Sequence, residues 1–155
     1  MAGKKREEKR GPATIQNRKA SFDYHFEETF EAGIVLAGAE VKSLYAGRAN
    51  LTDAYCRVVG NELWLLSFDI ESYEYSNRFA PDRRRDRKLL MHRREIDQLR
   101  KKSEEKGLSL VPFKVYFKEG KVKVAIALGR GKKTYDKRES IKEKDERRAR
   151  DRFDD

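Results

Sequence analysis

The longest run of alternating apolar and polar residues lies near the N-terminus and predicts the central strand of the fold. The rings of Phe22, Tyr24 and Phe26 alternate with polar side chains, as on a half-buried strand whose successive side chains point to opposite faces. Apolar residues resume at 34–36, directly after Gly33. We therefore predict one long strand that bends at this glycine.

The next segments predict a short helix and a hairpin. Apolar residues recur at helical spacing over 39–45, which favours a helix there. Two runs typical of strands, 49–59 and 62–66, are separated by the dipeptide at Gly60. Glycine followed by asparagine between two such runs indicates a tight turn and hence an antiparallel pair.

A longer helix and a second hairpin complete the predicted body. Residues 89–106 carry a narrow apolar stripe, and Gly107 stands where a helix C-cap belongs. Strands are predicted over 108–117 and 121–128, joined through a turn at Gly120. In the second strand the valines, isoleucine and leucine face inward and the lysines outward.

These segments predict a mainly β protein with two charged ends. Six or so antiparallel segments with short turns favour a small closed barrel of the oligonucleotide-binding (OB) type with about three peripheral helices, although two packed sheets remain an alternative. Residues 1–17 are predicted to form a flexible basic arm, 18–130 the barrel, and 131–155 a charged tail. The tail holds acid-before-base pairs four residues apart, so we expect it to be disordered when free and helical on a partner.

Charge changes this picture most. The chain has 155 residues, 41% of them charged, with a mean hydropathy of −0.95 and a net charge of +10. Such a balance favours a polyanionic partner, either nucleic acid or an acidic membrane surface. No stretch is long and apolar enough to span a bilayer, and the first residues lack the apolar core of a signal peptide, so we expect a cytoplasmic protein.

The residues give little support for catalysis or for a bound metal or cofactor. Cys56 is the single cysteine, and His25 and His92 lie on different predicted elements without ligand spacing. The segment GRGKKT at 129–134 fails the Walker pattern, because Ile126 stands where that motif needs glycine. One enzymatic alternative stays open, in which Glu31, Glu40 and Asp53 converge to hold magnesium for RNA cleavage.

Cations beside aromatic rings favour RNA binding instead. Five arginines and lysines fall within 83–88, shortly after the rings of Tyr73, Tyr75 and Phe79. Aromatic rings stack on bases and cations pair with phosphates. Two lysines on the outer face of the strand 121–128 add to this pattern.

Three stretches resemble the bacterial SsrA-binding protein (small protein B) family. They are FEETFEAGIVLAGAEVKSLYAGRANL at 26–51, RKLLMHRREI at 87–96 and LGRGKKTYDKRESIK at 128–142. The resemblance implies an OB-type barrel with a tail that is unfolded in the free protein. It also implies an RNA-binding adaptor in ribosome rescue rather than an enzyme. Such proteins bind the tRNA-like domain of transfer-messenger RNA (tmRNA) and accompany it, with elongation factor Tu, into stalled ribosomes for trans-translation.

The resemblance also implies which residues act. Glu31, Leu90 and Lys123 match family positions tied to RNA binding. The residues that match the ribosome-engaging tail, placed near the decoding centre and in the vacant mRNA channel of the small subunit, are Gly131, Lys132, Lys133, Tyr135, Asp136, Lys137 and Arg138. A rival interpretation, a structural ribosomal protein or general single-strand binder, uses the same barrel and basic ends. It differs in predicting little preference among RNAs.

Overall fold

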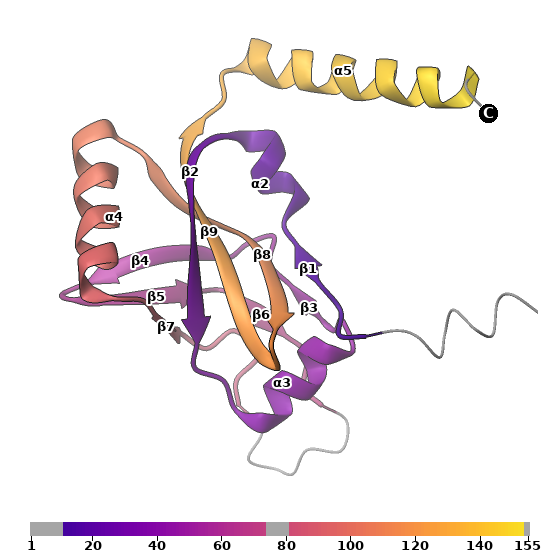
Figure 1. Cartoon of the computed structure of the whole chain (residues 1–155). Helices are drawn as coiled ribbons and strands as arrows, with labels where there is room; N and C mark the ends of the chain where they lie inside the picture. Colours follow the sequence, from indigo (N-terminus) through magenta and orange to yellow (C-terminus); the bar gives the residue numbers. More distant parts are fainter. Residues whose placement is uncertain (1–10, 74–80, 154–155) are drawn as a thin grey trace, which may run out of the picture.

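The protein is mainly β, as expected, with an antiparallel seven-stranded sheet flanked by helices (Figure 1). The computed structural model describes residues 11–73 and 81–153, except for the side chains of 134–136 and 150–153. The strands are β1 (Ile15–Gln16), β2 (Tyr24–Ile34), β3 (Ala49–Asn50), β4 (Tyr55–Val59), β5 (Glu62–Leu66), β6 (Asp69–Ile70), β7 (Arg87–Leu90), β8 (Ser109–Lys118) and β9 (Lys121–Gly131). The helices are α2 (Arg18–Asp23), α3 (Gly38–Tyr45), α4 (Arg93–Lys106) and α5 (Thr134–Phe153).

The strand pairing confirms an antiparallel sheet but does not close it into the predicted barrel. In the described residues the order is β1-β8-β9-β2-β7-β5-β4, and β3 pairs separately with β6. The outer edge of β8 pairs with β1 at Lys114 and Val115. Further along β8, Pro112 has no N–H to donate and a bulge follows it, so a side-chain-lined pocket rather than a ladder separates β8 from β4.

Both predicted hairpins and the first predicted helix are confirmed. β4 and β5 pair around Gly60, β8 and β9 pair around Gly120, and α3 covers the segment expected to be helical. Gly60 and Gly120 have φ values of 62° and 77°, which suit glycine because it lacks a Cβ. These elements were predictable because turn and strand lie next to each other in the sequence.

Several predicted boundaries are wrong. The central strand ends at Ile34 rather than continuing over 35–36, and the run expected over 49–59 is divided into β3 and β4. Phe22 lies in α2 rather than in the central strand, because the side chain of Asn17 caps that helix by accepting a hydrogen bond from Ala20 N at 3.1 Å. The helix expected over 89–106 begins only at Arg93. Its first apolar residues belong to β7, which pairs with both β2 and β5.

The ends of the chain differ from the predicted arm and tail in detail. Ile15 is buried and pairs in β1, and Asn17 is 4% exposed, so part of the segment expected to be an arm belongs to the fold. The N-terminal ten residues lie outside the described residues. The tail forms the helix α5, which extends away from the sheet beside α2 (Figure 1).

The hydrophobic core lies against the inner face of the sheet. Its fully buried members include Leu44, Leu51, Leu63, Leu65, Phe68, Leu89, Leu99, Val115, Val124, Ile126 and Leu128. Helix α4 contributes Ile96 and Leu99, which are the inner face of the apolar stripe seen in the sequence. Within the described part of the chain, no helix combines the length and apolar character needed to cross a membrane.

A buried ion cluster fixes β7 against the start of α3. Glu40 Oε2 accepts a hydrogen bond of 2.7 Å from Arg87 Nε and one of 3.2 Å from Arg85 Nε. Glu40 Oε1 accepts a further hydrogen bond of 2.9 Å from Ala37 N, which caps the helix. Arg87, fully buried, also donates to the carbonyl oxygen of Phe68. Because the buried charges of Glu40 and Arg87 are paired with each other and hydrogen-bonded, the cluster is tolerated inside the fold.

We predict that Glu40→Gln destabilises the protein by about 3–5 kcal/mol at neutral pH, because it leaves the buried guanidinium of Arg87 without a counter-charge. Urea unfolding measures this difference. Glu62→Gln is the matched control, since it removes an exposed carboxylate 3.6 Å from Lys88 Nζ and should cost less than about 1 kcal/mol. Equal costs for the two variants would contradict the assigned role of Glu40.

The same variant should change how stability depends on pH. Burial alone would raise the pKa of Glu40, but the hydrogen bonds from Arg85, Ala37 N and Arg87 hold it below its usual value. A lowered pKa gives stability that is present above the unfolded pKa of about 4.3 and is lost as the pH falls through the folded value. Acidification through that window should therefore destabilise the wild type more steeply than Glu40→Gln.

Candidate nucleic-acid interface

The strands β2, β9 and β8 carry a basic surface on the face turned away from the core. The register aligns Glu31 with Ala125, and Ala125 with Lys114, so these side chains share one side of the sheet. Alternation then places the following residues on the same side: Glu31, Gly33, Lys114, Tyr116, Lys118, Lys121, Lys123 and Ala125. We call this set the outer face. It sets four lysines around one carboxylate.

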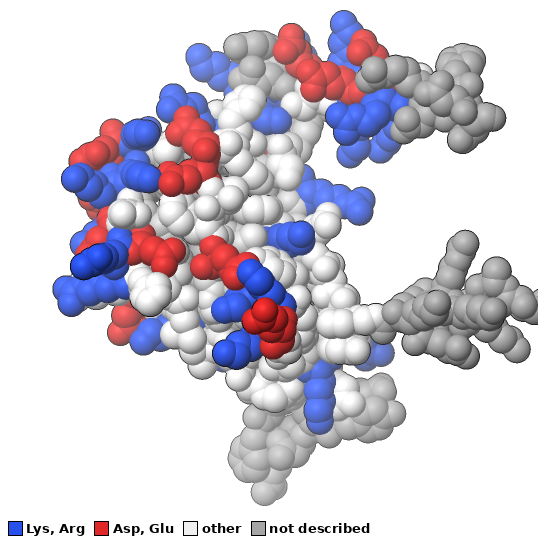
Figure 2. Space-filling model, viewed as in Figure 1, with Lys and Arg blue, Asp and Glu red and all other residues white. Residues whose placement is uncertain are grey.

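Three residues named from the sequence meet at one end of the outer face. Gly33 of β2 pairs with Lys123 on one side and with Leu90 on the other, and Glu31 lies two residues before it. The structure therefore brings Glu31, Leu90 and Lys123 together from three segments. Figure 2 shows blue and red side chains gathered over this lower end of β2 and β9, whereas the surface higher along β9 is largely uncharged.

A shallow pocket opens beside Gly33, Leu90 and Lys123. It has a volume of about 410 Å³. Its walls are Gly33, Ile34, Leu36, Val41, Leu90, Gly120, Lys121, Val122 and Lys123. Leu90 is 51% exposed, although its neighbour Leu89 is fully buried. An exposed leucine can pack against the face of an unstacked base, and the two lysines beside it can pair with the phosphate of the same nucleotide.

The carboxylate of Glu31 is held by partners on β8. Tyr116 Oη donates a hydrogen bond to Glu31 Oε2, and Lys118 Nζ lies 3.4 Å from Glu31 Oε1. The hydrogen bond from Tyr116, with smaller contributions from Lys118 and Lys123, holds the pKa of Glu31 below its usual value. Glu31 is therefore ionised at neutral pH and accepts hydrogen bonds only.

Tyr116 is the partner that sequence reasoning missed. Burial, and then the hydrogen bond to Glu31, raise the pKa of Tyr116 to about 12, so its hydroxyl remains protonated at neutral pH. The amine of Lys114 lies 5.3 Å from the centre of its ring. Lys114 and Lys118 alternate with inward-facing residues just as Lys121 and Lys123 do, so that pattern was available. The contact from Tyr116 to Glu31 joins residues 85 positions apart, so no local sequence pattern predicts it.

The arginine run predicted to bind phosphate serves mainly to hold the fold. Arg87 is fully buried, so the expectation of a phosphate contact is wrong for this residue. Arg85 pairs with Glu40, Arg83 with Asp69 at 2.9 Å, and Arg84 with Asp53 at 3.5 Å. Of the rings expected beside this run, Tyr73 contacts the amine of Lys42, 5.3 Å from its ring centre, whereas Tyr75 and Phe79 lie outside the described residues.

The three carboxylates of the magnesium alternative are engaged by different partners. Glu31, Glu40 and Asp53 each have separate partners, a tyrosine for the first and arginines for the other two. In the described ranges no three histidine, cysteine, aspartate or glutamate side chains are grouped as metal ligands would be. Burial raises the pKa of Cys56, which keeps that thiol protonated.

The ribosome-engaging residues expected in the tail lie at the opposite end of the same strands. Gly131 ends β9 opposite Tyr24, nine positions along β2 from Gly33. At about 3.3 Å per residue, the two ends are separated by roughly 30 Å. Within the described tail, Lys132 is partly exposed and Arg138 is exposed. The side chains of Tyr135 and Asp136 are not described.

The first turn of α5 is fastened to α2. Lys132 N donates a hydrogen bond of 2.8 Å to the carbonyl oxygen of Asp23, and Lys137 Nζ lies 3.3 Å from Asp23 Oδ1. The amine of Lys137 also lies 6.0 Å from the ring centre of Phe22. Lys133 is exposed, and Lys132 Nζ donates to Ser140 Oγ at 2.8 Å. Beyond this turn, the described side chains of α5 are exposed except for Ser140, which is partly exposed.

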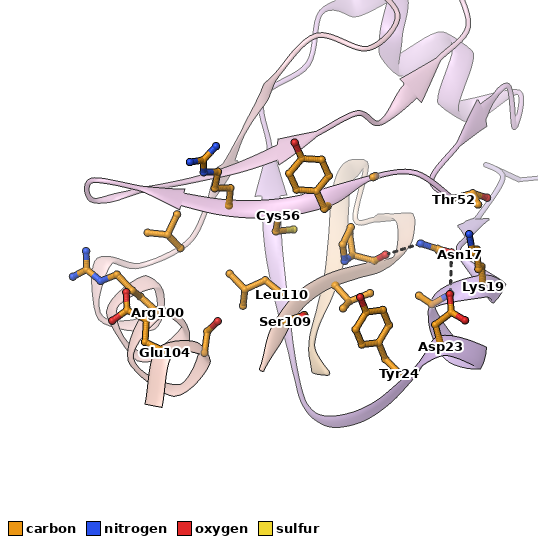
Figure 3. Close-up of a pocket in the computed structure, with 18 residues that line it drawn as sticks. Asn17, Lys19, Asp23, Tyr24, Thr52, Cys56, Arg100, Glu104, Ser109 and Leu110 are labelled. Carbon is orange, nitrogen blue, oxygen red and sulfur yellow. Dashed lines mark hydrogen bonds between the residues drawn. The ribbon is translucent and has the colours of Figure 1, made fainter. Parts of the chain in front are cut away.

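A second and larger pocket lies between β4, β8, α2 and α4 (Figure 3). Its volume is about 590 Å³. Its charged residues are of both signs, with Lys19, Arg57 and Arg100 near Asp23 and Glu104. Three cations against two carboxylates give this lining a smaller excess of positive charge than four lysines against one carboxylate give the outer face, so the outer face is the stronger candidate for RNA.

Comparisons with known proteins identify the family of this chain. The sequence profile of the SmpB protein family matches residues 14–154. The SsrA-binding protein of Syntrophotalea carbinolica is 55% identical over 129 residues, which cover 83% of this chain and 86% of the relative. The SsrA-binding protein of Bacillus cereus is 51% identical over 138 residues, covering 89% of both chains.

A solved structure agrees with the sequence relatives. It is described as "tmRNA-SmpB: a journey to the center of the bacterial ribosome", and superposes with a TM-score of 0.67 at 46% identity, covering 83% of this chain and 94% of the solved one. A family profile spanning nearly the whole chain, together with relatives about half identical, establishes the relationship. The chain belongs to the SmpB family of SsrA-binding proteins.

Proposed function

We propose that this protein binds the tRNA-like domain of tmRNA and delivers it to stalled ribosomes, where it supports trans-translation and ribosome rescue. The observation that carries the proposal is the meeting of Glu31, Leu90 and Lys123 around Gly33, in a chain of the SsrA-binding family. The description of the solved relative names tmRNA, SmpB and the bacterial ribosome, which supports both partners.

Each of the three residues has a distinct chemical role in the proposed site. Lys123 pairs with a backbone phosphate, as a lysine on a basic strand face is suited to do. Leu90 packs its exposed side chain against an unstacked base beside the pocket. Glu31 accepts a hydrogen bond from a base amino group or a ribose hydroxyl, because its ionised carboxylate has no proton to donate.

The tail supplies the ribosomal half of the proposed mechanism. Gly131 acts as the hinge, and residues 132–155 enter the vacant mRNA channel near the decoding centre. Tyr135 stacks there, while Lys132, Lys133, Asp136, Lys137 and Arg138 make the polar contacts. The 20 residues of α5 are long enough to span roughly 30 Å as a helix. Because this helix has little apolar surface to pack against the body, contacts with RNA phosphates would stabilise it by offsetting the entropy lost on ordering.

The body and the N-terminal arm have separate roles in the proposed function. The body over 18–130 is an OB-type barrel that recognises RNA and is left open between β4 and β8, which line one pocket without pairing; the antiparallel strand order supports this proposal. Residues 1–17 supply a basic arm, and Ile15 and Asn17 anchor its C-terminal end. The protein acts in the cytoplasm as an adaptor rather than an enzyme. It meets elongation factor Tu through their shared tmRNA complex.

We predict that the wild type binds the tRNA-like domain of tmRNA more tightly than an ordinary tRNA or a single-stranded oligomer. Glu31→Ala should weaken this binding by about tenfold or more, because it removes a charge-assisted hydrogen bond. Lys123→Ala should weaken binding to all three RNAs and reduce the slope of log affinity against log salt by about 0.9. Filter binding or fluorescence anisotropy at several salt concentrations measures both effects.

Lys101→Ala is the matched control for charge, because Lys101 is an exposed lysine on α4, away from the outer face. It should leave affinity and preference close to those of the wild type. Equal affinity of the wild type for all three RNAs would instead favour the general single-strand binder.

We also predict that a chain truncated after Arg130 still binds tmRNA but does not support tagging. The truncation removes the tail, while the strand pairs that hold Glu31, Leu90 and Lys123 remain. RNA affinity and thermal midpoint show that the body is intact, and peptide tagging in a reconstituted translation reaction on a message without a stop codon gives the outcome. Normal tagging by the truncated chain would rule out the two-part mechanism.

A further inference from the structure

Tyr116 is the one residue of the outer face that touches Glu31 with a neutral donor. Its hydroxyl donates to Glu31 Oε2, whereas Lys118 Nζ lies at the longer distances of 3.4 and 3.5 Å from the two carboxylate oxygens. An ionised carboxylate offers about four acceptor positions on its two oxygens. Tyr116 fills one acceptor position on Oε2 and so limits rotation of the carboxylate. The remaining acceptor positions of Glu31 then point in a defined direction.

Tyr116 is placed by its strand and has little side-chain freedom. Its backbone lies in β8, where Tyr116 pairs with Lys123 of β9. Its ring carries the amine of Lys114 near its face. A tyrosine has only two side-chain torsions, so a ring held in this way brings its hydroxyl to one place. By contrast, a lysine has a long flexible stem and a rotating ammonium group, which attracts a carboxylate without fixing its direction.

Without the tyrosine hydroxyl, Glu31 would be surrounded by cations. Lys118 is close, and Lys123 also lowers the pKa of Glu31 through its charge. If the carboxylate turned toward either lysine, its acceptor positions would be filled by the protein. The ion pair would also neutralise a lysine that is needed to bind phosphate. The hydrogen bond from Tyr116 opposes this rotation of the carboxylate, because it holds Glu31 Oε2 toward β8.

We propose that Tyr116 is a positioning residue that orients the Glu31 carboxylate to accept a hydrogen bond from a nucleotide hydroxyl or amino group, and that it thereby contributes to preference for the tRNA-like RNA. This inference rests on the proposed function, since it assigns Glu31 a ligand in RNA. It adds that recognition requires a pair of residues 85 positions apart, of which only the carboxylate meets the RNA.

The test is a double-mutant cycle on the full-length chain. Tyr116→Phe removes only the hydroxyl and should weaken binding to the tRNA-like domain by about three- to tenfold, which corresponds to one lost hydrogen bond. In a Glu31→Ala background, Tyr116→Phe should have no further effect, because its action passes through the missing carboxylate. Tyr55→Phe, at a 50% exposed tyrosine on β4, is the matched control and should bind as the wild type does.

Two further readouts separate positioning from general stability. Tyr116→Phe should raise the pKa of Glu31, observed through its side-chain carboxyl carbon by NMR, since the hydrogen bond that chiefly lowers it is lost. The salt slope of binding should stay unchanged, because no cation is removed. A thermal midpoint within a few degrees of the wild type shows that the fold persists.

The outcomes distinguish this inference from the function it rests on. If the wild type prefers the tRNA-like RNA and Glu31→Ala weakens it, but Tyr116→Phe binds like the wild type, the positioning role is wrong and the proposed function stands. An equal loss from Tyr116→Phe with and without Glu31 would mean that Tyr116 contacts RNA itself, which also overturns the inference. If the wild type shows no preference, both proposals fall.

Discussion

The pairing of β2 on both edges at Gly33 is the constraint on which the candidate site depends. One edge of this position pairs with Lys123 and the other with Leu90, so the backbone ladder sets the spacing of residues that are distant in sequence. The strand β7 is only four residues long and pairs with β2 at two positions. The buried ion cluster of Glu40 and Arg87 fastens it from the inner side, which links stability of the core to geometry of the surface.

Electrostatics in this protein is more selective than the net charge of +10 suggests. Much of the arginine run is used internally, with Arg87 buried and Arg85 bound to the same carboxylate. The lysines of β8 and β9 remain on the outer face, where they surround a single acidic residue. Lysines supply attraction that any RNA can use, whereas an oriented carboxylate discriminates between donors and acceptors. Glu31 is therefore the residue on this face with the greatest capacity for specificity.

The sequence predicted those features that are local and missed those that depend on distant contacts. Hairpins at Gly60 and Gly120 follow from a turn beside two alternating strands. The strand β7 was read as the start of a helix, because two adjacent leucines fit either structure and the pairing with β2 and β5 decides between them. Family resemblance, rather than pattern, named Leu90, whereas alternation alone already placed Lys123 on the exposed face of its strand. The partner of Glu31 was found only in the structure, since no pattern links positions on β2 and β8.

The central claim is that RNA is recognised on the outer face at the Gly33 end of β2 and β9. Mapping of backbone amide shifts by NMR, during titration of the full-length protein with the tRNA-like domain of tmRNA, tests it most directly. The account predicts that the largest changes fall at Glu31, Leu90, Tyr116 and Lys123. Changes concentrated instead around the pocket between β4 and α4, with the outer face unaffected, would contradict it.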